Sequence, residues 1–104
     1  MSVLMEFSVY PADRGESLSP FVARCVQIVE KSGLPYTLGS MGTTVEAEDV
    51  HELLDLVEQC VTDLQKDCHR VEASIRLDWR AGAQSRMEYN LESVEAKLGH
   101  KVQT

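Results

Sequence analysis

The sequence predicts an α+β fold, the ferredoxin-like split βαβ sandwich with an antiparallel four-stranded sheet and an added C-terminal helix. Two observations predict it. Apolar residues alternate with polar ones in some segments and recur every three to four residues in others. These segments follow one another as strand, helix, strand, strand, helix, strand and helix. Right-handed crossovers then give a sheet ordered four, one, three, two, with the first two helices on one face.

The first third of the chain predicts one strand and one helix. Alternating apolar residues over 3–9 indicate a strand with one buried face. A loop rich in Pro, Asp, Gly and Ser covers 11–17. Ser19 is expected to cap a helix that has Pro20 as its first residue, where proline loses no hydrogen bond. Gly33 is expected to end this helix in the left-handed conformation.

A β-hairpin is predicted in the middle of the chain, with strands over 36–40 and 43–48. Met41 and Gly42 are expected to form a tight two-residue turn, because glycine reaches positive φ without the steric cost of a Cβ. This turn would place Leu38 opposite Val45 on the core side of the sheet. The matching pairs would be Ser40 with Thr43 and Tyr36 with Ala47.

The second half predicts a helix, a strand and a final helix. Asp49 is expected to cap a helix whose apolar stripe runs to Leu64. A strand over 70–79 follows, with one apolar face. A connector over 81–84 leads to a helix over about 85–98, whose narrow apolar stripe suggests packing on a neighbouring molecule. The 104 residues fit a single domain, 1–104.

Polar residues of three strands are expected to converge on the sheet face away from the helices. The predicted strand order places strand one between strands three and four, so their outward side chains become neighbours. They include Glu6, Ser8, Thr44, Glu46 and Asp78. In the same register Thr43 projects toward the core, where its backbone is the part available to a ligand. The result is a shallow, open polar surface.

Composition and spacing exclude several classes of function. A formal charge of −7 disfavours a nucleic-acid partner, since phosphate binding needs clustered Lys and Arg. No apolar run approaches the roughly 20 residues of a membrane span, and the N-terminus lacks a signal-peptide pattern. A cytoplasmic location is therefore expected, in which the three cysteines stay reduced. Cys25 and Cys60 lie on apolar helix faces and are expected to pack in the core.

Neither a metal site nor a catalytic constellation is expected. The three histidines are scattered without metal-ligand spacing, and no nucleophile motif is present. Glu6 and Glu46 have the chemistry of a general acid and base pair, which leaves a hydrolase or isomerase open as a third-ranked hypothesis. Such an enzyme would lose turnover in Glu46→Gln. Simple ligand contacts are the favoured interpretation of these carboxylates.

Several motifs in a fixed order carry a resemblance. The central one is Tyr36-x-Leu38-x-x-Met41-Gly42-Thr43-x-x-Glu46, with Val9-Tyr10-Pro11 before it and Ile75-Arg76-Leu77-Asp78-x-Arg80 after it. Together they resemble the YkoF-like thiamine-binding family over nearly the whole chain. The resemblance implies a ferredoxin-like fold, reversible non-catalytic binding of thiamine or its hydroxymethylpyrimidine part, and no separate cofactor. It also implies dimers or tetramers assembled through sheets and C-terminal helices.

The sequence departs from the family pattern at three positions. Ala47 replaces a usual glycine, Arg76 a frequent lysine and Asn90 another frequent lysine. The first change is conservative. The other two bear on ligand or assembly preference, because arginine offers a planar fork and asparagine has no charge.

Thiamine joins a cationic thiazolium to an aminopyrimidine, so its host needs carboxylate or aromatic surface and paired donors and acceptors. The expected ligand contacts, on the open face or at a subunit interface, are Glu6, Ser8, Met41, Gly42, Thr43, Thr44, Glu46 and Asp78. An alternative is an oligomeric interaction or regulatory domain without a small-molecule ligand. In that case protein would cover Glu46 and leave no cavity beside it.

Overall fold

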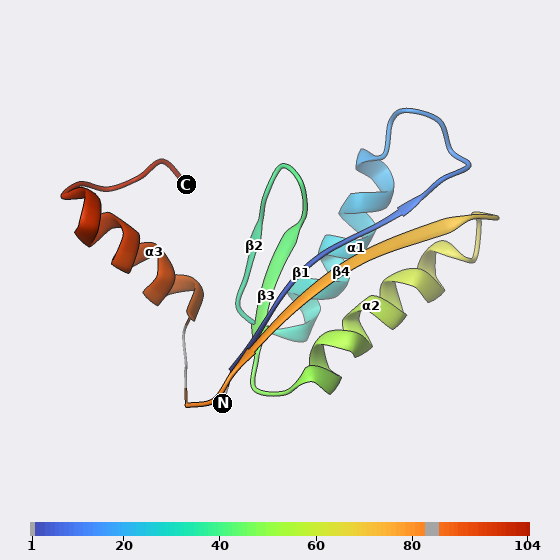
Figure 1. Ribbon diagram of the computed structural model, residues 1–104. Coiled ribbons are helices and arrows are strands. Elements are labelled where there is room, and N and C mark those ends of the chain that lie inside the picture. The colour runs from blue at the N-terminus through green and yellow to red at the C-terminus, as the bar shows by residue number, and fades with distance from the viewer. Residues whose placement is uncertain (1, 83–85) are drawn as a thin grey trace.

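The computed structural model describes residues 2–82 and 86–104. Its elements are β1 (Ser2–Pro11), α1 (Ser19–Ser32), β2 (Tyr36–Leu38), β3 (Thr43–Ala47), α2 (Val50–Leu64), β4 (Val71–Arg80) and α3 (Arg86–Leu98). The strands form one antiparallel sheet ordered β2-β3-β1-β4, as predicted. Helices α1 and α2 lie on the same side of this sheet, whereas α3 extends away from the two layers (Figure 1). The ferredoxin-like fold class is confirmed.

The core lies between the sheet and the two helices. The odd-numbered residues of β1, from Val3 to Val9, are buried there, as their alternation predicted. Leu53, Cys60 and Leu64 of α2 are fully buried against them. Because α1 and α2 pack mainly over the middle of the sheet, this core holds the long strand β1 firmly at its centre.

The helix ends follow local chemistry, with one difference from expectation. The Asp49 carboxylate accepts the Glu52 backbone N–H at 2.9 Å and caps α2, as predicted. Gly33 ends α1 at φ 77°, also as predicted. The expected cap at Ser19 is wrong. Leu18 occupies the N-cap position of α1 and makes no side-chain cap, so Ser19 is already the first helical residue.

The hairpin differs from its predicted register by two residues. Leu38 pairs with Thr43 and Tyr36 with Val45, so the connection is a four-residue loop over 39–42 rather than a two-residue turn. The backbone N–H of Gly39 donates to the carbonyl of Gly42 at 2.8 Å and closes this loop. Since side chains alternate with a period of two, the slip preserves the faces: Thr43 and Val45 are buried on the core side as expected.

Gly42 has a different role from the predicted one. It does not take a positive φ. A Cβ on this residue would instead lie 3.2 Å from both the carbonyl oxygen of Phe7 and the Oγ of Ser8. Glycine therefore lets the hairpin loop pass close to β1, a requirement of space rather than of turn conformation.

Strand β4 is less covered than its apolar pattern suggests. Ile75, Leu77 and Trp79 pair with buried β1 residues and share their face of the sheet. They nevertheless remain 42%, 40% and 54% exposed. Strand β4 forms one edge of the sheet, so an apolar stripe stays open beside the core.

The C-terminal helix begins at Arg86, close to the expected start. Residue 85 of the predicted helix and residues 83–84 of the predicted connector lie outside the described residues. The hydrogen bonds that join α3 to the rest of the described chain come from Arg86 and Met87 alone. The helix is therefore held at its first turn.

Candidate functional site

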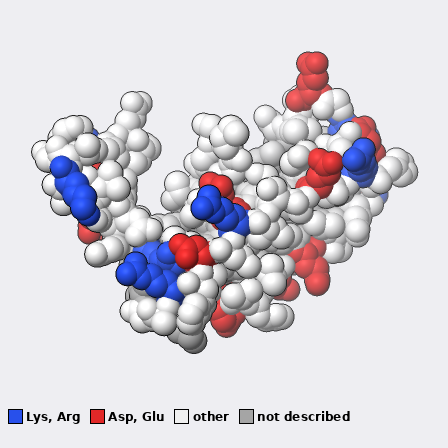
Figure 2. All heavy atoms as spheres, viewed as in Figure 1, with Lys and Arg blue, Asp and Glu red and all other residues white. Residues whose placement is uncertain are grey.

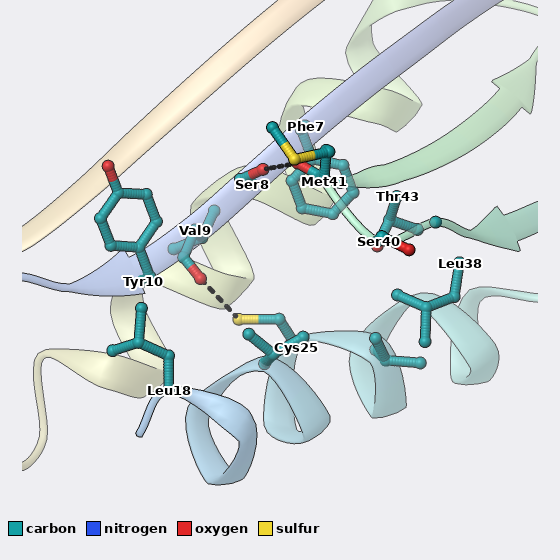
Figure 3. A pocket seen from close by; sticks show the side chains of 14 residues that line it. Phe7, Ser8, Val9, Tyr10, Leu18, Cys25, Leu38, Ser40, Met41 and Thr43 are labelled. Carbon is teal, nitrogen blue, oxygen red and sulfur yellow. Dashed lines mark hydrogen bonds between the residues drawn. The ribbon is translucent and has the colours of Figure 1, made fainter. Parts of the chain in front are cut away.

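A pocket of about 300 Å³ lies between the end of β1, helix α1 and the loop over 39–42 (Figure 3). Its walls are mostly apolar, and a few polar groups stand among them. The apolar lining comes from Phe7, Val9, Leu18, Val22, Cys25, Val26, Leu38 and Met41, and the polar lining from Ser8, Tyr10, Ser40 and Thr43. Such a mixture of apolar walls and few polar groups is typical of small-molecule sites.

The pocket exists because β1 is longer than its partner β3. Strand β4 pairs with β1 as far as Pro11, whereas β3 pairs with it only as far as Phe7. Beyond Phe7 the chain before β3 curves away as the loop over 39–42. The gap that a continued strand would fill is bounded by α1, and the pocket occupies it.

Ser8 fixes the loop at the rim of the pocket. Its hydroxyl donates to the carbonyl oxygen of Met41 at 3.1 Å. The Met41 side chain itself is 91% exposed. Four of the predicted site residues, Ser8, Met41, Gly42 and Thr43, thus meet at this pocket. Thr43 is buried, so little of its side chain is free for a ligand.

Tyr10 lines the pocket at the end of β1, and its ring points away from α1 (Figure 3). It lies opposite Glu72 in the β1–β4 pair. The neighbouring Glu72 carboxylate raises the pKa of Tyr10 above its ordinary value, because it favours the protonated phenol and repels the phenolate. This pair offers a cation both a ring face and a negative charge.

Cys25 forms part of the α1 wall. Its thiol contacts the carbonyl of Val9 at 3.9 Å, and the thiol of Cys60 contacts the carbonyl of Cys25 at 3.8 Å. The neighbouring Cys60 thiol lowers the pKa of Cys25, whereas the Cys25 thiol, together with burial, raises the pKa of Cys60. Both cysteines are buried, as the sequence predicted.

A second, more open recess lies on the opposite face of the sheet. It has a volume of about 530 Å³ and is lined by Leu4, Glu6, Thr44, Arg76, Leu77 and Asp78. The polar convergence expected there is thus present for Glu6, Thr44 and Asp78. Glu6 faces Arg76 across the β1–β4 pair, so charges of both signs are present. Figure 2 likewise shows acidic and basic side chains intermingled over the face it draws.

The expectation that Glu46 projects freely from this face is wrong. The residue does lie on that face, opposite Leu4, but it is only 6% exposed. Its carboxylate accepts hydrogen bonds from the backbone N–H of Arg86 at 2.7 Å, from that of Met87 at 3.3 Å and from the Ser2 hydroxyl at 3.1 Å. Glu46 therefore binds the N-terminus of α3, where a negative charge is favourable.

Asp78 is likewise engaged by the start of α3. The guanidinium of Arg86 donates to the Asp78 carbonyl at 2.8 Å and forms an ion pair with its carboxylate. Within the described chain the buried Arg86 Nε has no hydrogen-bond partner. Glu46 and Asp78 thus both bind the start of α3, whereas Glu6, the third carboxylate predicted to contact a ligand, does not.

Part of the pocket has no signal in the sequence. Val22, Cys25 and Val26 fit the apolar stripe of a helix and are indistinguishable there from core residues. Tyr10 falls at the end of an alternating strand, where an aromatic residue is ordinary. These residues line an opening that exists only because β2 and β3 are short. The predicted strands, over 36–40 and 43–48, were too long.

Across residues 2–82 and 86–104, no three His, Cys, Asp or Glu side chains are grouped so that they could hold a metal ion. Within the same ranges no helix has the length and apolar character needed to cross a membrane.

Comparison with known proteins identifies the family. The sequence matches the family model described as thiamine-binding protein over residues 5–95. The chain belongs to the thiamine-binding protein family. A mycobacterial member of the UPF0045 proteins, Mb1933 of Mycobacterium bovis, is 35% identical over 98 residues, covering 94% of this chain and 96% of the relative. A UPF0045 protein of Methanothermobacter thermautotrophicus is 33% identical, covering 92% of this chain and 99% of its own.

Solved structures agree with this membership of the thiamine-binding protein family. The crystal structure of the hypothetical protein MJ1052 of Methanocaldococcus jannaschii superposes with a TM-score of 0.82 at 27% identity, covering 89% of this chain and 95% of that one. A Thermotoga maritima protein, whose name links it to thiamine biosynthesis or salvage, superposes with a TM-score of 0.78 at 23% identity. The latter comparison covers 90% and 99% of the two chains and supports the fold alone.

Proposed function

We propose that this protein binds thiamine reversibly and without catalysis, and that the hydroxymethylpyrimidine part enters the pocket beside the loop over 39–42. The observation that carries the proposal is the pocket itself, of about 300 Å³ with mainly apolar walls. That volume is at the lower end of the range for small-molecule sites. Membership of the thiamine-binding protein family supports the choice of ligand.

The chemistry of the pocket suits a flat ring with a cation attached. Phe7 and the α1 side chains provide apolar contacts for the faces of a pyrimidine. The Tyr10 ring, with the Glu72 carboxylate beside its hydroxyl, lies where a thiazolium could be stabilised by cation–π and charge interactions. We therefore propose that the pyrimidine lies deeper and the thiazolium nearer Tyr10.

The predicted contacts divide accordingly. Ser8, Met41, Gly42 and Thr43 belong to the proposed site, chiefly through the loop geometry that they maintain. Glu6, Thr44 and Asp78 form the competing site in the open recess. Glu46 is assigned to holding α3. A pocket-filling variant separates the two sites.

Titration calorimetry with thiamine and with hydroxymethylpyrimidine tests the proposal. Val22→Phe adds a ring to the pocket wall and is expected to weaken binding more than tenfold. Leu54→Phe, on the exposed side of α2, is the matched control and should bind as wild type does. Thr44→Val probes the open recess. Selective loss of binding in Thr44→Val, with Val22→Phe unaffected, would move the site to the open face. No heat from the wild type at millimolar ligand would reject the function.

We also propose that the protein acts in the cytoplasm, with no cofactor of its own, and is not an enzyme. The acid and base hypothesis needed Glu6 and Glu46 side by side on an accessible surface. Glu46 instead accepts backbone hydrogen bonds from α3 and is buried. This burial supports binding over catalysis, and turnover that disappears in Glu46→Gln while α3 stays docked would contradict it.

Self-association is the remaining part of the proposal. The open stripe of Ile75, Leu77 and Trp79 on edge strand β4 is apolar and long, the kind of edge that natural proteins cover. Helix α3 adds exposed apolar residues, which are Tyr89, Leu91, Val94 and Leu98. We propose that a second copy covers both, giving a dimer or tetramer. Sedimentation should show an oligomer that Leu77→Lys dissociates, whereas a monomeric wild type would refute this part.

A further inference from the structure

Among the described residues, the edge of β1 that faces the pocket carries a peptide N–H with no hydrogen-bond partner and a C=O that accepts only from a thiol. In antiparallel pairing, the backbone groups of successive residues point alternately to the two neighbouring strands. The Ala12 N–H donates to the Arg70 carbonyl at 2.8 Å and continues the β1–β4 ladder, so even-numbered residues of β1 face β4. Odd-numbered residues therefore face β3. The last of these with a β3 partner is Phe7, paired with Thr43.

Val9 is the next odd-numbered residue, and its backbone faces the place where β3 is missing. Its carbonyl contacts the Cys25 thiol of α1 at 3.9 Å, which independently places that carbonyl on the pocket side. A thiol is a weak donor and satisfies a carbonyl poorly. Among the described residues no hydrogen bond is made by the Val9 N–H. Pro11 has no N–H, so the N–H of Val9 is the last backbone donor of β1 on this edge.

We propose that the backbone of Val9 forms hydrogen bonds with the edge of the aminopyrimidine ring, in the way that a strand residue does with its partner strand. The Val9 N–H would donate to the ring nitrogen next to the amino group, and the Val9 carbonyl would accept from that amino group. This inference rests on the proposed function and identifies the chemical feature that the site recognises. That feature is an acceptor and a donor side by side on one planar ring.

Recognition by the backbone has a consequence for ligand choice. Replacing the amino group by an oxo group reverses the pattern, because the ring nitrogen then carries a proton and the substituent accepts. The Val9 N–H and carbonyl would then each meet a group of the wrong kind. Leaving such groups unsatisfied is expected to weaken binding by about 10- to 100-fold. Loss of the thiazolium should have a smaller effect, since hydroxymethylpyrimidine keeps the whole edge.

Amide-resolved NMR of the full chain tests the inference. The probe is 4-amino-5-hydroxymethyl-2-methylpyrimidine, and the comparison compound is its 4-oxo counterpart. At saturation with the amino compound, exchange of the Val9 amide with solvent should slow at least tenfold. The Met5 amide is the internal control, because it lies on the same edge and is already paired with Val45. The oxo compound should bind at least tenfold more weakly.

The outcomes separate this inference from the function on which it rests. Calorimetric binding of the amino compound without slowed exchange at Val9 would overturn the inference and leave the proposed function standing. Equal affinity for the amino and oxo compounds would overturn it as well. Absence of binding by thiamine and both pyrimidines would overturn the proposed function, and this inference with it.

Discussion

Glu46 is expected to hold the first turn of α3 beside the sheet, so Glu46→Gln should release α3 at that turn. The carboxylate accepts the backbone N–H groups of Arg86 at 2.7 Å and of Met87 at 3.3 Å, one on each oxygen. Glutamine keeps one carbonyl oxygen and replaces the other by an amino group. One helix N–H then meets a donor instead of an acceptor, and the negative charge at the helix N-terminus is gone.

The size of the effect follows from these contacts. Losing one hydrogen bond to a charged group costs about 1.5–3 kcal/mol, and losing a charge at a helix N-terminus costs about 0.3–1 kcal/mol. Together these are about 2–4 kcal/mol, which lowers the ratio of docked to released helix by about 30- to 700-fold. A released helix of 13 residues is marginal in water, so α3 should melt as well as detach.

Hydrogen exchange of the α3 amides measures this release. Exchange should accelerate across residues 88–98 in Glu46→Gln, with little change in the amides of β1. Glu48→Gln is the matched control, because Glu48 is exposed and lies just beyond the end of β3. Unchanged α3 exchange in Glu46→Gln would refute the assigned role. Loss of pyrimidine binding in the same variant, with α3 still docked, would instead identify Glu46 as a ligand contact.

Three further predictions concern the pocket and the helix layer. Gly42→Ala places a Cβ 3.2 Å from β1 atoms, so it should cost about 1–3 kcal/mol in urea unfolding and weaken pyrimidine binding. A hydrogen bond from Arg24 lowers the pKa of Asp63 below its ordinary value of 3.8. This interaction stabilises the fold at pH values above 3.8, and the stabilisation is lost as the pH falls and Asp63 becomes protonated. The fall in melting temperature between pH 4 and 2 should therefore be smaller in Arg24→Gln. In Cys60→Ala the pKa of Cys25 should rise, slowing its alkylation at pH 8 several-fold.

Controls make each of these results decisive. Ser40→Ala alters the same loop without adding a Cβ and should leave the free energy of unfolding unchanged. Glu16→Gln removes an exposed charge that does not contact Arg24, and its melting temperature should fall between pH 4 and 2 as much as that of the wild type. Bound thiamine should slow the alkylation of Cys25, because that thiol lines the pocket. Wild-type stability in Gly42→Ala would contradict the first argument. The second would be contradicted if the melting temperature of Arg24→Gln fell between pH 4 and 2 as much as that of the wild type, and the third if Cys25 were alkylated faster in Cys60→Ala.

Which face of the sheet each strand residue occupies was decided by the sequence. Alternation is a local property of a strand, so the odd residues of β1 were correctly assigned to the core. The same parity survived the two-residue error in the hairpin register, which left Thr43 and Val45 on the predicted face. The helix spans, the Asp49 cap and the strand order also followed from short-range patterns and connection rules.

The position of the site was decided only by tertiary structure. The pocket depends on how far β3 accompanies β1, and that depends on the loop over 39–42 passing close to Ser8. The burial of Glu46 depends on its hydrogen bonds with the start of α3, which lies 40 positions further along the chain, a contact with no local signature. Alternation gives the direction of a side chain. Whether another element then covers it is fixed by packing between distant segments.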